Sequence, residues 1–250
     1  MAYDIIGDIH GQADELHALL VHMGYEDRDG AYRHPSRTAI FVGDFIDKGP
    51  QQVESVMIVR NMVRANTAQA VMGNHEFNAI AWHTPDPDLP GEFLRQHGGE
   101  KGEGNRKQHE AFLAEVKDSP SLHKEIIDWF MTLPLWLDLP GIRVVHACWH
   151  DDYMRQLNDL LTPAQQVTPE LMVAASRAGR MEYLAVEWRL CRQRDSRHTH
   201  ATHALAKGAE LTTVRDNLRH ASVSTTSVYL HTDQAKRARQ MRDAFVSPNA

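Results

Sequence analysis

The chain is poor in cysteine and has no long apolar runs. Its 250 residues include only two cysteines, Cys148 and Cys191, and neither belongs to a CxxC pair. Two isolated thiols exclude a disulfide framework and favour a reducing compartment, so we expect a cytoplasmic protein. No apolar run approaches the ~18 residues that a membrane-spanning helix needs, and the N-terminus lacks a signal-peptide pattern. We therefore expect no membrane partner.

The net charge of −6 is unevenly distributed along the chain. Residues 1–188 carry 16 Lys and Arg against 28 Asp and Glu, whereas residues 189–250 carry 11 against 5. Clustered basic residues are typical of surfaces that bind phosphate backbones, and they also occur as solvated faces. We therefore divide the chain into a domain of residues 1–188 and a basic tail of residues 189–250, for which weak DNA binding is one expectation.

Short apolar runs alternate with helical patterns in the first part. Helices are predicted from Ala13 and after Pro50, and strands at residues 3–6, 38–42, 68–72 and 142–145. This alternation indicates an α/β layered fold, in which ligands gather at the carboxyl ends of the strands.

The next stretch, residues 83–106, is rich in Gly and Pro and predicts a long loop near the site. Helical patterns resume at residues 107–117 and 122–131, and helix starts are expected at Thr162-Pro163 and Thr168-Pro169. For the tail we expect a small, mostly α-helical unit.

Each of the four strand-like runs is followed by side chains that bind metals. Asp8 and His10 are two residues apart, so on an extended strand end they can hold one cation together. Asp44 can bridge two cations through its two carboxylate oxygens, and Asn74 and His146 can complete the second set. Mixed oxygen and nitrogen ligands without a thiolate suit two divalent ions of Mn, Fe or Zn.

Two cations held in this way would polarise phosphoryl oxygens and lower the pKa of a bridging water. His75 follows a ligand directly and is the natural general acid for the leaving oxygen. Asp47 can fix the tautomer of His75, Lys48 can neutralise phosphate charge, and Glu76 suits a structural role. The pattern predicts a metal-dependent phosphoester hydrolase.

Each motif taken alone is also typical of an ordinary turn or helix cap. Their joint occurrence in this order, each after a strand-like run, favours the site. The remaining histidines of the first part are most simply surface or helix-face residues: His17, His22, His34, His83, His97, His109 and His123.

Residues 1 to about 188 resemble the calcineurin-like metallophosphoesterases, specifically the phosphoprotein phosphatase branch and its bacterial diadenosine-tetraphosphatase-like members. The resemblance rests on the segments at residues 7–11, 43–49 and 73–76. It implies that Asp8, His10 and Asp44 hold one metal, that Asp44, Asn74 and His146 hold the other, and that His75 and Asp47 form the acid pair. The implied substrate is a phosphoprotein or a dinucleoside polyphosphate.

The chain departs from this family at two points. Lys48 stands where the family usually has Arg, which keeps the charge but loses a bidentate grip on phosphate. The family also has a later metal-binding His in a Gly-His motif, which no segment after His146 reproduces, and His150 is a poor substitute. The departure implies a domain that is incomplete at its C-terminal end, with an impaired second metal site.

The tail resembles the end of the catalytic domain of a tyrosine recombinase, or phage integrase. The resemblance implies DNA integration or recombination by attack of Tyr229 on a DNA phosphodiester, with Arg197 and His220 stabilising the phosphate charge. Arg194 and Ser196 depart from the family pattern, and the upstream half of that domain has no counterpart here. A small basic helical unit with Tyr229 as a buried aromatic is the alternative interpretation, and the junction is expected at residues 188–194.

Overall fold

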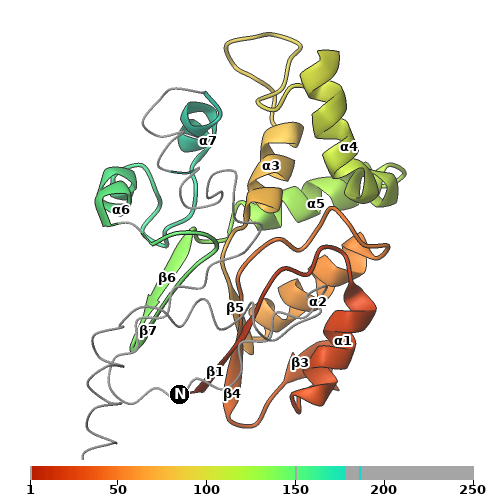
Figure 1. Cartoon of the computed structure of the whole chain (residues 1–250), viewed down its shortest axis with the longest axis vertical. Coiled ribbons are helices and arrows are strands. Elements are labelled where there is room, and N and C mark those ends of the chain that lie inside the picture. The colour runs from red at the N-terminus through yellow and green to blue at the C-terminus, as the bar shows by residue number, and fades with distance from the viewer. Residues whose placement is uncertain (1, 150, 178–185, 187–250) are drawn as a thin grey trace, which may run out of the picture.

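A sheet of three parallel strands lies at the centre of the computed structural model, which describes residues 2–149, 151–177 and 186 (Figure 1). The strand order is β1 (Ala2–Ile6), β4 (Arg37–Phe41), β5 (Ala68–Ala70). Helix α1 (Ala13–His22) and a hairpin of β2 (Glu26–Arg28) and β3 (Ala31–Arg33) lead from β1 to β4, and α2 (Gln52–Arg64) leads from β4 to β5. The predicted α/β layered fold is confirmed.

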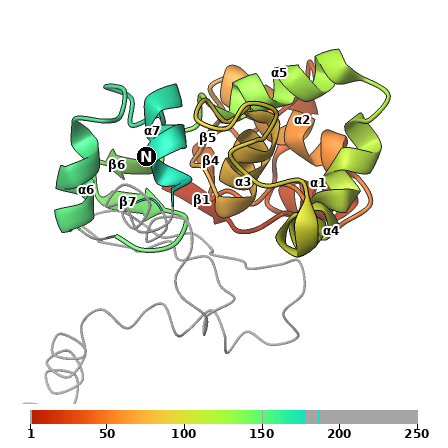
Figure 2. The same ribbon diagram turned by 90° about the horizontal axis from the view of Figure 1, so that it is seen from above.

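The two faces of this sheet are covered by different elements. Ile6 and Phe41 pack in the main core with apolar side chains of α1 and α2, whereas Ile5 and Ile40 point to the other face. Side chains alternate along a strand, so neighbouring residues enter different cores. The second face is covered by a hairpin of β6 (Trp136–Leu139) and β7 (Ile142–Val145), opposite α1 and α2 (Figures 1 and 2).

The strand expected at residues 142–145 is therefore confirmed as β7, although it pairs antiparallel with β6. Among the described residues, β7 is not part of the parallel sheet. It still ends beside the carboxyl ends of β1 and β4, because its register on β6 sets Val145 against Trp136 and its side chains pack on Val42.

Three helices lie beyond the carboxyl ends of the parallel strands: α3 (Asn74–His83), α4 (Gly99–Val116) and α5 (Pro120–Phe130). The loop predicted between His83 and Arg106 begins where expected, because α3 ends at His83, but its predicted C-terminal end was wrong, because α4 already begins at Gly99. The glycines of this stretch do not all mark a loop. Gly102 is buried against the backbone of His97, where a side chain would not fit.

The last described elements are α6 (Asp151–Asn158) and α7 (Pro169–Ala175). The start of α7 is as predicted, with Thr168 Oγ1 accepting from Leu171 N at 3.1 Å. No helix begins at Thr162-Pro163, because the Thr162 carbonyl closes a turn with Gln165 N instead. The expected junction at residues 188–194 and the tail lie outside the described residues. No helix in the described part is long and apolar enough to cross a membrane.

Candidate active site

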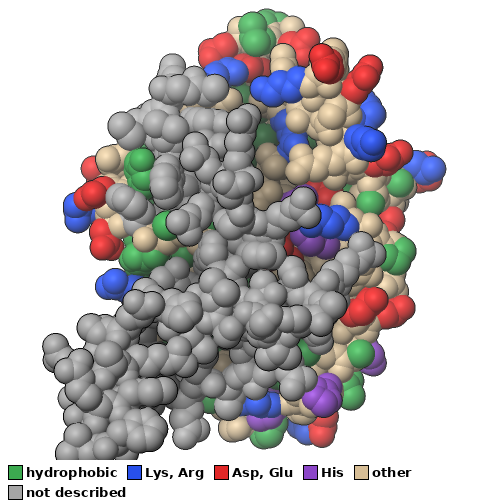
Figure 3. Space-filling view, viewed as in Figure 1, with side chains coloured by type: hydrophobic (Ala, Val, Ile, Leu, Met, Phe, Trp, Pro, Cys, Tyr) green, Lys and Arg blue, Asp and Glu red, His purple; other side chains and the backbone are tan. Residues whose placement is uncertain are grey.

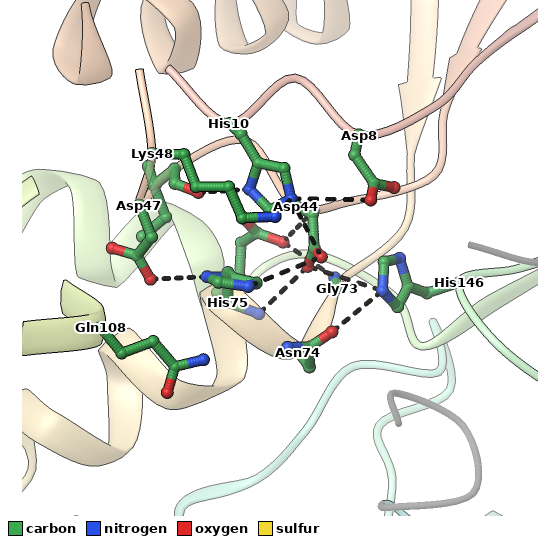
Figure 4. A network of polar contacts seen from close by, with 12 residues as sticks. Asp8, His10, Asp44, Asp47, Lys48, Gly73, Asn74, His75, Gln108 and His146 are labelled. Atoms are coloured by element: carbon green, nitrogen blue, oxygen red, sulfur yellow. Dashed lines mark hydrogen bonds and ion pairs between the residues drawn. The ribbon is translucent and has the colours of Figure 1, made fainter. Parts of the chain in front are cut away.

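The predicted ligands meet at one edge of the central sheet. Asp8 and His10 follow β1, Asp44 follows β4, Asn74 begins α3 after β5, and His146 follows β7 directly. Carboxyl ends of parallel strands share one edge, so segments far apart in the sequence converge there. Figure 4 shows these side chains pointing toward one another around Asp44.

Asp44 lies at the centre of the cluster, and each of its two carboxylate oxygens faces a histidine nitrogen. Its Oδ2 lies 3.9 Å from His10 Nε2 and 3.9 Å from His75 Nε2, and its Oδ1 lies 3.5 Å from His146 Nε2. Two groups of potential metal ligands share this carboxylate: His10, Asp44 and His75, and Asp8, Asp44 and His146. Asp8 Oδ2 also lies 3.6 Å from His10 Nε2, so Asp8 is within reach of both groups.

Backbone hydrogen bonds orient the two imidazoles that were predicted as ligands. His10 Nδ1 donates to the Ile46 carbonyl at 2.8 Å, and His146 Nδ1 donates to the Val42 carbonyl at 2.6 Å. A carbonyl can only accept, so both rings carry their hydrogen on Nδ1. The Nε2 lone pairs then face the centre, in the tautomer that a metal ligand needs.

Glycines allow the connecting loops to approach one another closely. A Cβ on Gly43 would lie 2.3 Å from Gly73 N, and a Cβ on Gly73 would lie 2.3 Å from Asp44 Oδ1. Gly43 also has a φ of +92°, and Asp44 follows it at +57°. Two successive residues in the left-handed region turn the chain sharply after β4, which aims the Asp44 carboxylate at the cluster.

Glu76 is a buried carboxylate that holds these loops in place. Its Oε2 accepts from Asp44 N at 2.8 Å and Gly73 N at 2.9 Å, and its Oε1 accepts from Phe45 N at 2.8 Å. Burial and the charge of Asp44 raise the pKa of Glu76 to about 7, against the lowering effect of the backbone donors. The expected structural role of Glu76 is consistent with these contacts.

The imidazoles around Asp44 keep it ionised. Burial raises the pKa of Asp44, but its electrostatic interactions with the His146, His75 and His10 rings and a hydrogen bond from the His75 backbone outweigh burial and hold the pKa at about 2. Asp44 therefore remains a carboxylate, which is the form that coordinates cations.

The predicted acid pair is also in contact. His75 Nδ1 donates to Asp47 Oδ2 at 2.7 Å. Burial lowers the pKa of His75, whereas the carboxylates of Asp44 and Asp47 raise it by more, to about 9. Lys48 lies beside this pair, but its Nζ donates to His10 Nε2 at 2.6 Å and so contacts a ligand atom.

One histidine that was expected on a surface or helix face belongs to this network. His109 of α4 is 1% exposed, and its Nδ1 donates to Asp47 Oδ1 at 2.6 Å. The helical spacing of His109, Phe112 and Val116, which are all buried on one face of α4, was the available signal in the sequence. Arg197, His220 and Tyr229 of the recombinase-like segment and His150 lie outside the described residues.

The residues present fit a pair of divalent cations. Asp44 is shared by two ligand groups, and Asp8 Oδ1 is buried without a hydrogen-bond partner in the described part of the chain. Histidine nitrogens and carboxylate oxygens without thiolate suit Mn, Fe or Zn. Figure 3 shows histidine side chains beside basic and acidic ones in a recess of the described surface.

Comparison with known proteins identifies the class that this fold and site define. The family model of the calcineurin-like phosphoesterases matches residues 1–170, and the chain belongs to this family. Enzymes of this family use two divalent metal ions, in agreement with the shared carboxylate of Asp44.

Several curated relatives are named bis(5'-nucleosyl)-tetraphosphatase PrpE, asymmetrical. The protein from Oceanobacillus iheyensis is 31% identical over 148 residues, which cover 59% of this chain and 55% of that protein. The one from Bacillus cereus is 42% identical over 163 residues, which cover 62% of this chain and 60% of that protein. The chain thus spans little more than half the length of these relatives.

A solved structure of a protein serine/threonine phosphatase from Saccharomyces cerevisiae is also similar. It is 20% identical with a TM-score of 0.47, and the match covers 74% of this chain and 48% of that one.

Proposed function

We propose that the protein is a metal-dependent phosphoester hydrolase. The observation that carries this proposal is Asp44, whose two carboxylate oxygens face two different sets of potential metal ligands. When bound, two divalent cations supply polarisation of the phosphoryl oxygens and a more acidic water. In this proposal the cations are held by Asp8, His10, Asp44, Asn74 and His146.

The remaining side chains have separate roles. His75 gives a proton from Nε2 to the leaving oxygen as water attacks phosphorus and the bond to that oxygen breaks. Asp47 accepts from Nδ1 and, with Asp44, raises the pKa of His75 to about 9, so the ring also carries a proton on Nε2 that it can transfer. With a cation bound, His10 Nε2 would serve as its ligand instead of accepting from Lys48, and the Lys48 ammonium would then be available to neutralise phosphate charge.

Each cation has three of the ligands that the resemblance implies, and the second has only one carboxylate among them, that of Asp44. Asn74 Oδ1 and His146 Nε2 lie 3.1 Å apart and would hold this cation together with Asp44. The described residues after His146 contain no further histidine. We therefore infer that this cation binds more weakly than the first.

Dinucleoside polyphosphates are the proposed substrate class, because the relatives are named as bis(5'-nucleosyl)-tetraphosphatases. A phosphoprotein is the alternative. Diadenosine tetraphosphate and a phosphoserine peptide, compared at equal Mn²⁺, distinguish the two classes. Faster release of nucleotides than of phosphate from the peptide supports the proposal, and the reverse order contradicts it.

The hydrolase proposal is tested by Mn²⁺-stimulated hydrolysis of an aryl phosphate. Asp44→Asn removes the carboxylate charge that the two cations would share. We expect activity to fall at least about 100-fold, a larger loss than removal of a hydrogen-bond partner of a metal ligand usually causes. Asp128→Asn makes the same change on the exposed face of α5 and should keep full activity. A wild-type protein that neither binds metal nor turns over substrate would contradict the proposal.

For the tail, the resemblance to tyrosine recombinases remains a hypothesis from the sequence. It predicts a covalent adduct of the protein with nicked DNA that disappears in Tyr229→Phe. If the protein instead binds DNA without forming an adduct, and the binding weakens as salt rises, the tail contacts DNA only through basic side chains and phosphates. A cytoplasmic location likewise remains an expectation from the cysteine content.

A further inference from the structure

We infer that His109 is a positioning residue for the general acid, acting through Asp47. This inference rests on the proposed hydrolase function. The carboxylate of Asp47 accepts one hydrogen bond on each oxygen, from His75 Nδ1 at 2.7 Å and from His109 Nδ1 at 2.6 Å. The three side chains therefore form a buried chain that starts on α4 and ends at the cluster.

The backbone of Asp47 is held independently of its carboxylate. Its φ is +89°, and its N–H donates to Gln52 Oε1 at 2.6 Å. Gln52 is itself fixed, because its Nε2 donates to the Gly49 carbonyl. What remains free is rotation of the Asp47 side chain, and the two histidines set that rotation.

Loss of His109 would leave Asp47 Oδ1 buried without its donor. An unpaired buried carboxylate oxygen is costly, so the group would turn toward another donor or admit water. Either response moves the Oδ2 atom that His75 Nδ1 binds. The direction of the His75 ring, and with it the position of the Nε2 proton, would then no longer be fixed.

Helix α4 is well placed to hold this partner. The His109 ring packs 5.1 Å from the ring of Phe112 and 6.2 Å from that of Trp82, measured between centroids. Further along α4, Glu115 accepts from Gln52 N at 2.6 Å and from Val53 N at 2.9 Å. The helix is thus joined to the segment that carries Asp47 at two places.

A purely structural role for His109 makes different predictions. A packing residue would change stability and would slow all substrates alike. A positioning residue changes how strongly the rate depends on the leaving group, because a good leaving group needs little help from a general acid.

The first test compares phenyl phosphate, a poor leaving group, with p-nitrophenyl phosphate, a good one, on the Mn²⁺-loaded full chain. His109→Leu should lower kcat for phenyl phosphate at least about tenfold more than for p-nitrophenyl phosphate, within the 10²–10⁴-fold that general acids contribute. His109→Asn keeps an N–H donor near the position of Nδ1 and should restore most of that ratio.

His123→Leu is the matched control. The His123 ring lies 5.5 Å from the ring of Phe112, which also packs against His109. Its Nε2 has no hydrogen-bond partner among the described residues. This variant should leave the ratio of the two rates unchanged. Equal losses on both substrates in His109→Leu, as for any packing change, would overturn the inference.

The second test needs no turnover. In protein with ¹⁵N-labelled histidine, the His75 ring signals are assigned by their loss in His75→Gln. We expect the Nδ1–H of His75 to be protected from exchange in the wild type, to exchange at least about tenfold faster in His109→Leu, and to recover in His109→Asn. Unchanged His75 signals in His109→Leu would overturn the inference. A wild type inactive with Mn²⁺ would contradict the hydrolase proposal alone, and the ring signals would still decide this one.

Discussion

At the scale of single residues, one buried carboxylate organises the backbone around the site. Glu76 is 0% exposed and binds three N–H groups that belong to two different loops. These groups have no other partner of comparable geometry in the described structure. The position of Asp44 therefore depends on Glu76, although Glu76 is not one of the proposed ligands.

Replacement of Glu76 tests this dependence. Glu76→Ala leaves three buried donors unsatisfied, each costing roughly 1–3 kcal/mol, so we expect a loss of at least about 3 kcal/mol in the free energy of unfolding. Urea denaturation followed by circular dichroism measures it. Glu110→Ala, an exposed position on α4, should change stability by less than about 0.5 kcal/mol. A small effect of Glu76→Ala would show that the loops are held by other contacts.

The sequence predicted the residues that belong to short contiguous motifs. Asp8, His10, Asp44, Asn74 and His146 lie close together, because each follows a strand within a few residues. Their grouping differs from the expected one, since His10 lies with His75 and Asp8 with His146 on the two sides of Asp44. His109 was not predicted. Its partner Asp47 is 62 residues away, and no local pattern reports a contact across that distance.

At the scale of elements, α4 shows why glycine content alone misled the loop prediction. Gly102 and Gly104 both lie in this helix, but their surroundings differ. A Cβ at Gly102 would lie 2.3 Å from the carbonyl carbon of His97, whereas a Cβ at Gly104 would meet nothing within 4 Å. One glycine is required by a close approach and the other is tolerated at an exposed position.

Alanine substitutions at these two glycines should therefore change the midpoint of thermal unfolding in opposite directions. Gly104→Ala should raise the midpoint of thermal unfolding, because alanine is favoured over glycine in a helix by about 1 kcal/mol. Gly102→Ala should lower the midpoint despite the same gain, because the backbone of His97 would have to move. Scanning calorimetry of the two variants measures both. Stabilisation by both would show that residues 97–102 are not packed as described.

A salt bridge joins the loop between α3 and α4 to the end of α7. Arg177 donates to both carboxylate oxygens of Asp86 and also contacts Asp88 at 3.0 Å. The hydrogen bonds from Arg177 hold the pKa of Asp86 at about 2, below its ordinary value of 3.8. A lowered pKa stabilises the folded chain above pH 3.8, and this contribution is lost as pH falls toward 2.

Arg177→Met should thus be less stable than the wild type at pH 7, and the difference should shrink below about pH 4. Urea unfolding at pH 7, 5 and 3.5 gives the comparison. A difference that stays constant over this range would mean that Arg177 contributes through packing of its side-chain stem and not through the carboxylate of Asp86.

At the scale of the whole molecule, the site depends on layers that the sequence indicated only in part. Alternating strands and helices predicted an α/β layered fold with the ligands at the carboxyl ends of the strands, and the parallel pairing of β1, β4 and β5 brings those ends to one edge. The same sequence pattern does not predict where β7 lies. A short apolar run does not reveal whether it joins a sheet or covers it, and β7 covers the face formed by Ile5 and Ile40. That packing brings His146 to Asp44.

The central claim is that Asp44 is shared by two cations, and calorimetric titration of the metal-free full chain with Mn²⁺ tests it most directly. We predict two binding events in the wild type and in Asp128→Asn, the second weaker than the first. Asp44→Asn should weaken both events at least about tenfold, because it removes a ligand charge common to both. Two unchanged binding events in Asp44→Asn, or the loss of only one, would contradict the shared carboxylate.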